Sequence, residues 1–254
     1  MTNSVTRNMT GATHSPLFVT KELFETRYQG AEAIFVAGSV VRGEASTYSD
    51  LDLVVIYPKV EAAYRDSFTF KGWPVEAFVH DSQTLRYFFE NVDKQIGRAT
   101  LADMVSEGHE IPCATVTTND LKSLAKATLR EGPPALTNDD VEDRRYHISE
   151  LIDDIREPRN RQELIASGTL IYQELADYYF RSNRSWAGTG KAVLRRMKKQ
   201  DPAFARKFAD AFDMLFAEGQ STKVVELAKE LLAPVGGFLF EGYRRDVSPD
   251  WRTP

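Results

Sequence analysis

The fold of this chain is decided by residues 35–56, which read FVAGSVVRGEASTYSDLDLVVI. An apolar run ends in the letters GS, a polar segment follows, and a second apolar run opens with DLD. Short apolar runs that are bounded by glycine and polar residues are typical of buried strands. We therefore expect strands over residues 33–37 and 51–57, joined by a polar loop.

The second expected strand carries two acidic residues at its start. Side chains two residues apart on a strand point to the same face, so Asp50 and Asp52 project together while Leu51 and Leu53 face the core. Two like charges this close repel each other unless a cation lies between them. Mg²⁺ commonly takes one or two carboxylates and completes its shell with phosphate oxygens and water. The acidic pair therefore predicts a magnesium site.

The Gly38-Ser39 pair supplies groups that suit a phosphate. A glycine lets the backbone come close to a ligand, and N–H groups at the start of a following helix can hold a phosphate. Arg42 lies three residues after Ser39 and can add a charge-assisted contact to a phosphate oxygen. These residues predict a phosphate-bearing ligand beside the acidic pair.

A third carboxylate fits the same arrangement. Residues 73–80 read WPVEAFVH, and their alternation predicts a strand over 75–80 with Glu76 in its middle. If this strand is a neighbour of the strand over 51–57, Glu76 meets the aspartates and serves as third metal ligand or general base. His80 shares a face with Glu76. The alternative is an acid on an edge strand that faces solvent.

The order and spacing of these residues resemble the signature of a known superfamily. Gly38-Ser39, a gap of ten residues and Asp50-Leu51-Asp52 are similar to the motif of the DNA polymerase beta-like nucleotidyltransferases. Within that superfamily, Gly-Ser-x-x-Arg-Gly followed by Ser-Asp-x-Asp resembles the branch that acts on small molecules. That branch includes aminoglycoside and lincosamide nucleotidyltransferases and stand-alone minimal nucleotidyltransferases.

The resemblance implies a role for each residue of the motif. Asp50 and Asp52 would ligate Mg²⁺, and Glu76 would complete the metal site or deprotonate an acceptor hydroxyl. The triphosphate of ATP or a related nucleotide would be held by four residues: Gly38, Ser39, Arg42 and Ser49. The implied reaction is attack of the hydroxyl on the α-phosphorus, with pyrophosphate as the leaving group.

The acceptor is expected to be a small hydroxyl compound, with an aminoglycoside-like antibiotic as the first choice by architecture. Three alternatives remain: a protein or RNA target modified at the same site, as by antitoxin-like relatives; a noncatalytic nucleotide-binding module; and the nucleic-acid-extending branch. The net charge of −5 weighs against the last of these, because general nucleic-acid binders are usually basic.

The expected fold class is α+β, with two domains in 254 residues. A small mixed β-sheet nucleotidyltransferase domain is expected over residues 1–118, beginning with a loose arm over 1–15. A helical acceptor-binding domain is expected over 119–254. Gly132-Pro133-Pro134 breaks the helical pattern and is the best linker within this region.

Other elements follow from periodicity and capping residues. A further strand over 67–70 is expected to form a hairpin through Lys71-Gly72. Helices are expected over eight ranges: 19–28, 82–95, 120–130, 139–155, 161–181, 191–199, 202–217 and 222–232. Capping-box spacing supports the start near Thr137, and Asp201-Pro202 supports another.

Two features of the helical half bear on ligands. Lys191 follows a glycine-rich turn at a helix start, and the resemblance implies that it reaches the triphosphate across a cleft between the domains. The alternative is a glycine-rich turn that only starts a helix. Five acidic residues at helical spacing either lie on a solvated surface, pair with nearby arginines or bind a cationic acceptor: Glu150, Asp153, Asp154, Glu174 and Asp177.

Composition places the chain among soluble proteins. Hydrophobic residues at 42% and charged residues at 27% exclude a disordered or collagenous chain. No apolar run approaches the ~20 residues of a membrane span, and the N-terminus lacks the apolar segment of a signal peptide. The single Cys113 cannot form an internal disulfide, which is typical of a reducing compartment. We expect a cytoplasmic enzyme that has no membrane contact.

Overall fold

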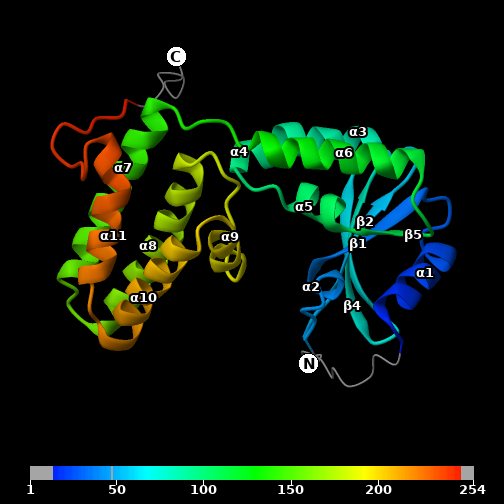
Figure 1. Ribbon diagram of the computed structural model, residues 1–254, viewed down its shortest axis with the longest axis horizontal. Coiled ribbons are helices and arrows are strands. Elements are labelled where there is room, and N and C mark those ends of the chain that lie inside the picture. Colours follow the sequence, from blue (N-terminus) through cyan, green and yellow to red (C-terminus); the bar gives the residue numbers. More distant parts are fainter. Residues whose placement is uncertain (1–13, 47, 247–254) are drawn as a thin grey trace, which may run out of the picture. The chain divides into compact units, whose positions relative to one another are not determined.

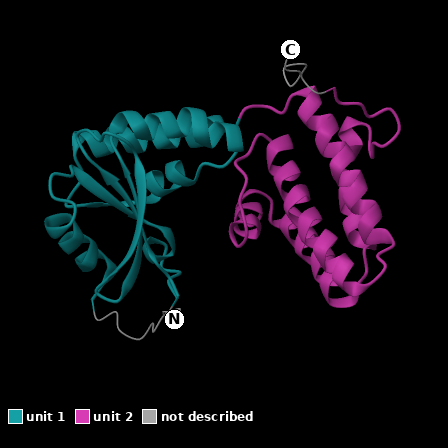
Figure 2. Ribbon diagram, turned by 180° about the vertical axis from the view of Figure 1, so that it is seen from behind, with its two compact units in different colours: residues 1–133 teal, residues 134–254 magenta. Residues whose placement is uncertain are grey.

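The computed structural model describes residues 14–46 and 48–246, and the chain divides into two compact units, residues 1–133 and 134–254 (Figures 1 and 2). Most of the loose arm expected over 1–15 lies outside the described residues. The α+β class is confirmed, since the first unit holds a mixed sheet with helices and the described part of the second is helical.

The boundary between the units lies later in the chain than the expected one. Residue 118 falls inside helix α6 (Val116–Glu131), which packs against α5 (Thr100–Glu107) of the first unit. The chain leaves this unit where Gly132 and the two prolines after it end α6.

The first unit is built on a five-stranded sheet in the order β3-β4-β2-β1-β5. Its strands are β1 (Ala33–Ala37), β2 (Leu51–Ile56), β3 (Tyr64–Phe70), β4 (Trp73–His80) and β5 (His109–Ile111). β2 and β4 are parallel, and the other neighbouring pairs are antiparallel. The expected strands are all present, β3 starts three residues before the expected Ser67, and β5 was not expected.

The hairpin between β3 and β4 turns at the expected residues. Lys71 has φ of 47° and Gly72 has φ of 82°, so both residues lie in the left-handed region. Two successive left-handed residues are the pattern of a type I′ turn, which matches the twist of the flanking strands. The turn fixes the register that pairs residues 64–70 of β3 with residues 73–79 of β4.

The two faces of the sheet have different coverings. One face packs its apolar side chains against α1 (Pro16–Thr26), with Val19 and Leu23 buried among Leu53 and Val55. The helices α5 and α6 lie on the other side (Figure 1), where Lys122 of α6 stands over the ring of Phe35. The acidic residues of the motif belong to this second face.

The segment after β4 is less regular than the single helix expected over 82–95. It consists of α3 (Ser82–Tyr87), a π-helical stretch (Phe88–Asp93) and α4 (Lys94–Ile96). Asp81 caps it: its carboxylate accepts from the Thr84 N–H at 2.7 Å, and the Thr84 hydroxyl accepts from the Asp81 N–H. A carboxylate at this position also interacts favourably with the helix dipole.

The second unit contains α7 (Asn138–Arg156), α8 (Arg161–Ser182), α9 (Ala192–Gln200), α10 (Pro202–Glu218) and α11 (Thr222–Leu232). These bounds agree closely with the expected ones, and side chains cap the starts of α7, α8 and α10. Thr137 and Asp140 form the expected capping box, and the Asp201 carboxylate accepts from the Ala203 and Phe204 N–H groups. None of the described helices is long and apolar enough to cross a membrane.

Candidate functional site

The strand register brings the second aspartate and the glutamate of the motif together. In the parallel pair β2 and β4, Asp52 lies opposite Glu76, and in the antiparallel pair β1 and β2, Ala37 lies opposite Asp52. Residues opposite each other share a face of the sheet. Asp52, the second residue of β2, and Glu76, the fourth of the eight residues of β4, are therefore neighbours on one face, as the sequence predicted for adjacent strands. Asp50, half-buried, directly precedes β2.

Gly38 brings the backbone against the Asp52 carboxylate. It follows β1 with φ of +78°, a left-handed value that favours glycine. A Cβ added there would lie far inside contact distance of Asp52 Oδ2. The position therefore requires glycine for two separate reasons, its backbone conformation and its closeness to the acid.

Serine hydroxyls connect the Gly-Ser turn to the acidic segment. Ser39 Oγ donates to Ser49 Oγ at 3.0 Å, and Ser49 Oγ also accepts from the backbone N–H of Ser46 at 2.8 Å. Ser49 directly precedes Asp50 in the chain. The two halves of the motif, ten residues apart in sequence, are thus joined by a direct hydrogen bond.

Arg42 pairs with carboxylates in this structure. Its Nε lies 3.1 Å from Glu44 Oε2, and one of its terminal nitrogens lies 3.5 Å from Glu107 Oε2 on α5. The Arg42 side chain is 36% exposed. Exposed ion pairs of this kind contribute only about 0–1 kcal/mol, so a phosphate can compete for the guanidinium.

Glu76 is also in an ion pair, with a residue that the sequence analysis did not single out. Its carboxylate accepts from Arg65 of β3, and the Arg65 guanidinium stands 5.2 Å from the centre of the Phe78 ring. Among the described residues, no three His, Cys, Asp or Glu side chains gather as a group that could hold a metal ion. The three carboxylates therefore share one region of the sheet without forming a closed cage.

The residues present fit a magnesium ion chemically. Asp50 and Asp52 offer hard carboxylate oxygens, and two carboxylates are as many as Mg²⁺ usually takes from a protein when a phosphate completes its shell. The glycine backbone beside Asp52 leaves no side chain at Gly38 in the way of such a ligand.

The remaining predicted residues lie elsewhere. Lys191 belongs to the second unit, where it directly precedes α9 and is exposed. His80 lies four residues beyond Glu76 on β4 and is 2% exposed, with its ring 4.9 Å from that of Phe88. Burial lowers the pKa of His80 to about 4, so the ring is neutral near pH 7. His80 is thus a neutral core residue.

The helical unit pairs some of its acidic side chains internally. Glu174 of α8 lies 2.9 Å from an Arg144 nitrogen of α7, and Asp153 lies 2.6 Å from an Arg156 nitrogen. Glu150 accepts from the hydroxyl of Tyr146 at 2.9 Å. For these three residues, the ion-pair or surface alternative describes the structure.

Asp93 is a buried acid that the sequence analysis missed. It ends the π-helical stretch, is 5% exposed and leaves Oδ2 without a hydrogen-bond partner. Burial, and then the charge of nearby Asp103, raise its pKa to about 7, although the Ala102 N–H favours the ionised form. The residue lies within the helix expected over 82–95, and nothing local in the sequence indicates the π-helical stretch or the burial of this side chain.

We expect Asp93→Asn to stabilise the protein at pH 8 and to have a smaller effect at pH 5. The unfolded carboxyl ionises above about pH 3.9, whereas the folded one keeps its proton up to about pH 7, so wild-type stability falls across that interval. The free energy of unfolding of the variant, relative to that of the wild type, should grow by about 2–4 kcal/mol between pH 5 and pH 8. Urea unfolding of both proteins at pH 5 and pH 8 measures this gain. A difference that does not change with pH would contradict the assignment.

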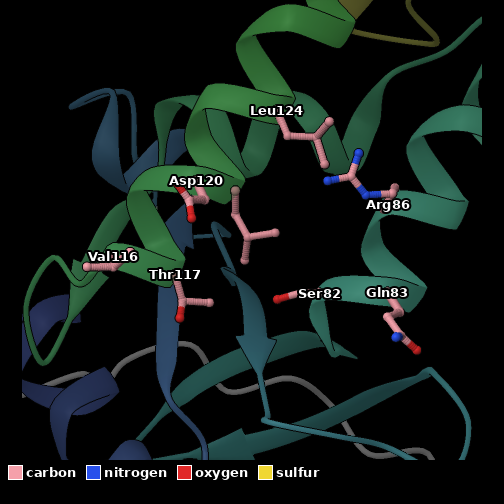
Figure 3. Close-up of a pocket in the computed structure, with 8 residues that line it drawn as sticks. Ser82, Gln83, Arg86, Val116, Thr117, Asp120 and Leu124 are labelled. Atoms are coloured by element: carbon pink, nitrogen blue, oxygen red, sulfur yellow. The ribbon is translucent and has the colours of Figure 1, made fainter.

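A separate cavity of about 430 Å³ lies between α3 and α6 (Figure 3). Its lining comes from the two helices: Ser82, Gln83, Arg86, Val116, Thr117, Asp120, Leu121 and Leu124. The lining begins with Ser82, beyond the last residue of β4, whereas Glu76 lies four residues before that end of the strand. The cavity contains none of the predicted site residues and does not belong to the acidic site.

A known family model covers the part of the chain that forms this site. The family model described as "Nucleotidyltransferase domain" matches residues 20–147. Among solved structures, a nucleotidyltransferase-like protein from Exiguobacterium sibiricum is 18% identical over 85% of this chain and 74% of its own, with a TM-score of 0.40. No curated protein matches the chain. The matched range contains every predicted site residue except Lys191.

Proposed function

The chain belongs to the nucleotidyltransferase domain family, and on that premise we propose that it transfers AMP from ATP to a hydroxyl of a small-molecule acceptor. The observation that carries the proposal is the pairing of Asp52 with Glu76 while the Gly38 backbone lies against the Asp52 carboxylate. Acids beside a close backbone approach suit a metal-bound triphosphate, because the anion then meets no side chain at the glycine.

In this proposal Asp50 and Asp52 hold Mg²⁺, which when bound neutralises charge on the phosphates and favours the leaving of pyrophosphate. Gly38 and Ser39 hold the triphosphate through backbone and hydroxyl groups. Ser49 orients Ser39 through the hydrogen bond between their hydroxyl groups.

The bond changes follow from the chemistry of nucleotidyl transfer. The acceptor oxygen forms a bond to the α-phosphorus, and the bond from that phosphorus to the bridging oxygen of the β-phosphate breaks. Glu76 takes the proton of the acceptor hydroxyl, which makes that oxygen a better nucleophile. Arg42 leaves its exposed carboxylate partners and contacts the leaving phosphates.

The second unit, residues 134–254, is proposed to select the acceptor, since α6, although it lies in the region expected for this role, belongs to the first unit. Lys191 is exposed directly before α9 and is proposed to contact the triphosphate when the nucleotide and the acceptor are bound. An aminoglycoside-like antibiotic is the first acceptor to test, because such a polycation offers both hydroxyls and charges that suit acidic side chains. Asp154 of α7 accepts from the Ser167 hydroxyl at 3.4 Å and Asp177 of α8 accepts from the Gln173 amide at 2.9 Å, so a cationic acceptor would have to compete with these contacts.

Mass spectrometry of reactions with the purified full chain tests the function. Each reaction contains ATP, Mg²⁺ and a panel of aminoglycosides, lincosamides and other polyols. The proposal expects one compound to gain the mass of one AMP in the presence of Mg²⁺ and none to gain it with EDTA. A gain on a protein or RNA in place of every small molecule would contradict the acceptor class. ATP binding without transfer to any acceptor would favour a noncatalytic module.

A further inference from the structure

Arg65 lies beside the proposed catalytic carboxylate on the same face of the sheet. Ser67 of β3 is opposite Glu76 of β4, and Arg65 is opposite Phe78, so Arg65 stands one same-face position along from Glu76. Its guanidinium bonds to the Glu76 carboxylate and also stands over the Phe78 ring. The Arg65 side chain is 58% exposed and the Glu76 side chain is 25% exposed.

The fold does not depend on this ion pair to hold β3. Asp66, which points to the opposite face, accepts from Arg27 at 2.7 Å, and Lys71 pairs with Glu22 of α1. Arg27 also stands 4.1 Å from the centre of the Phe68 ring. β3 is thus tied to α1 by contacts on the side away from the acidic site.

The ion pair changes what the acidic site can bind. Three uncompensated carboxylates on neighbouring strands would repel one another. A guanidinium on the third acid reduces that repulsion while no cation is present. A part-exposed ion pair is weak, so a divalent cation held by two aspartates can displace it.

We infer that Arg65 is a positioning residue that competes with the divalent cation for the Glu76 carboxylate. Glu76 is released toward Asp50 and Asp52 when the cation and its nucleotide arrive. The inference rests on the proposed function, because it assumes that the aspartates hold the metal, and it adds one Glu76 oxygen as a further ligand while the other oxygen stays available as the proposed base.

Mn²⁺ binding to the full chain, followed by electron paramagnetic resonance of the free ion, tests this competition without any turnover. Removing the competitor should tighten Mn²⁺ binding, so Arg65→Gln is expected to lower the Mn²⁺ Kd by about two- to fivefold. Arg65→Lys keeps a positive charge and should lie near the wild type. Arg27→Gln is the matched control, since it breaks an ion pair of the same strand on the opposite face and should leave the Kd unchanged.

A double-mutant cycle with Glu76→Gln identifies the route of the effect. If Arg65 acts through Glu76, Arg65→Gln changes the Kd in the wild-type background and not in the Glu76→Gln background. An equal change in both backgrounds would show a general field effect and overturn the inference. So would an unchanged Kd in the wild-type background. Thermal unfolding of each variant, expected to stay close to the wild type, shows that the change is not one of folding.

The aspartate variant separates this inference from the proposed function. Asp52→Asn should abolish Mn²⁺ binding in the same titration. Wild-type protein that binds no Mn²⁺, or Asp52→Asn protein that binds it as the wild type does, would contradict the metal site itself. Loss of binding in Asp52→Asn together with no effect of Arg65→Gln would overturn the role of Arg65 alone.

Discussion

Asp52→Asn is expected to keep the fold and to lose nucleotidyl transfer by about 10³-fold or more. The carboxylate is proposed to hold the metal that neutralises the phosphates, and an amide oxygen carries no net charge to replace it. Asp52 is opposite Glu76 in the sheet, so removal of one charge also relieves repulsion between two acids, and stability should not fall. Transfer rates with saturating ATP, together with thermal unfolding, measure both effects.

The matched control for this change is Asp66→Asn. Asp66 is an acid of the same sheet that points to the opposite face, where it pairs with Arg27. The control should keep wild-type transfer rates. If Asp52→Asn transferred as fast as the control, the assignment of the metal site to Asp52 would be untenable.

Gly38→Ala is expected to reduce transfer by at least about 10²-fold, because displacement of a catalytic group by about 1 Å has an effect of that size. The new Cβ would overlap the Asp52 carboxylate, so the carboxylate has to move. The left-handed φ of +78° adds a cost of about 1–2 kcal/mol in stability. Steady-state rates and urea unfolding separate the two consequences.

Gly43→Ala is a close control, since Gly43 has φ of +71° and no atom within 4 Å of the added Cβ. It carries a similar backbone strain without the overlap. The two variants should therefore lose similar stability, and only Gly38→Ala should lose activity. Equal losses of activity would attribute the effect to backbone strain and contradict the proposed contact with Asp52.

Much of the fold could be predicted from local pattern. Alternation and apolar runs identified β1, β2 and β4, and Lys71-Gly72 identified the hairpin, because each signal lies within a few residues. The three residues of β5 form a strand only by pairing with β1, and no local pattern reveals this. The helix α5 was also missed, because it is only eight residues long and no side chain caps its start.

The domain boundary shows how packing overrides a local signal. Gly132 and the two following prolines were identified as a break, yet the boundary was expected at residue 118, where the strands end. α6 remains with the first unit because it packs against α5, a helix that the sequence did not predict. Because α5 was not predicted, nothing in the sequence indicated that α6 packs in the first unit.

The acidic residues of the site could be predicted, but the partners around them could not. Asp50, Asp52 and Glu76 follow from strand periodicity and from the assumption of adjacent strands, which the register confirms for Asp52 and Glu76. The contact between Arg65 and Glu76 depends on the register between β3 and β4, and Arg65 precedes the strand expected over 67–70. The burial of Asp93 depends on tertiary packing around a π-helical turn.

The position of the transferred phosphorus distinguishes nucleotidyl transfer from transfer of the terminal phosphate. The purified chain is incubated with Mg²⁺ and a hydroxyl panel in two parallel reactions, one with ATP labelled at the α-phosphorus and one with ATP labelled at the γ-phosphorus. We predict that the α-label appears on an acceptor and that the γ-label is released in pyrophosphate. Neither the labelled acceptor nor the labelled pyrophosphate should form with Asp52→Asn. Transfer of the γ-label to the acceptor, or transfer of the α-label that persists in Asp52→Asn, would contradict this prediction.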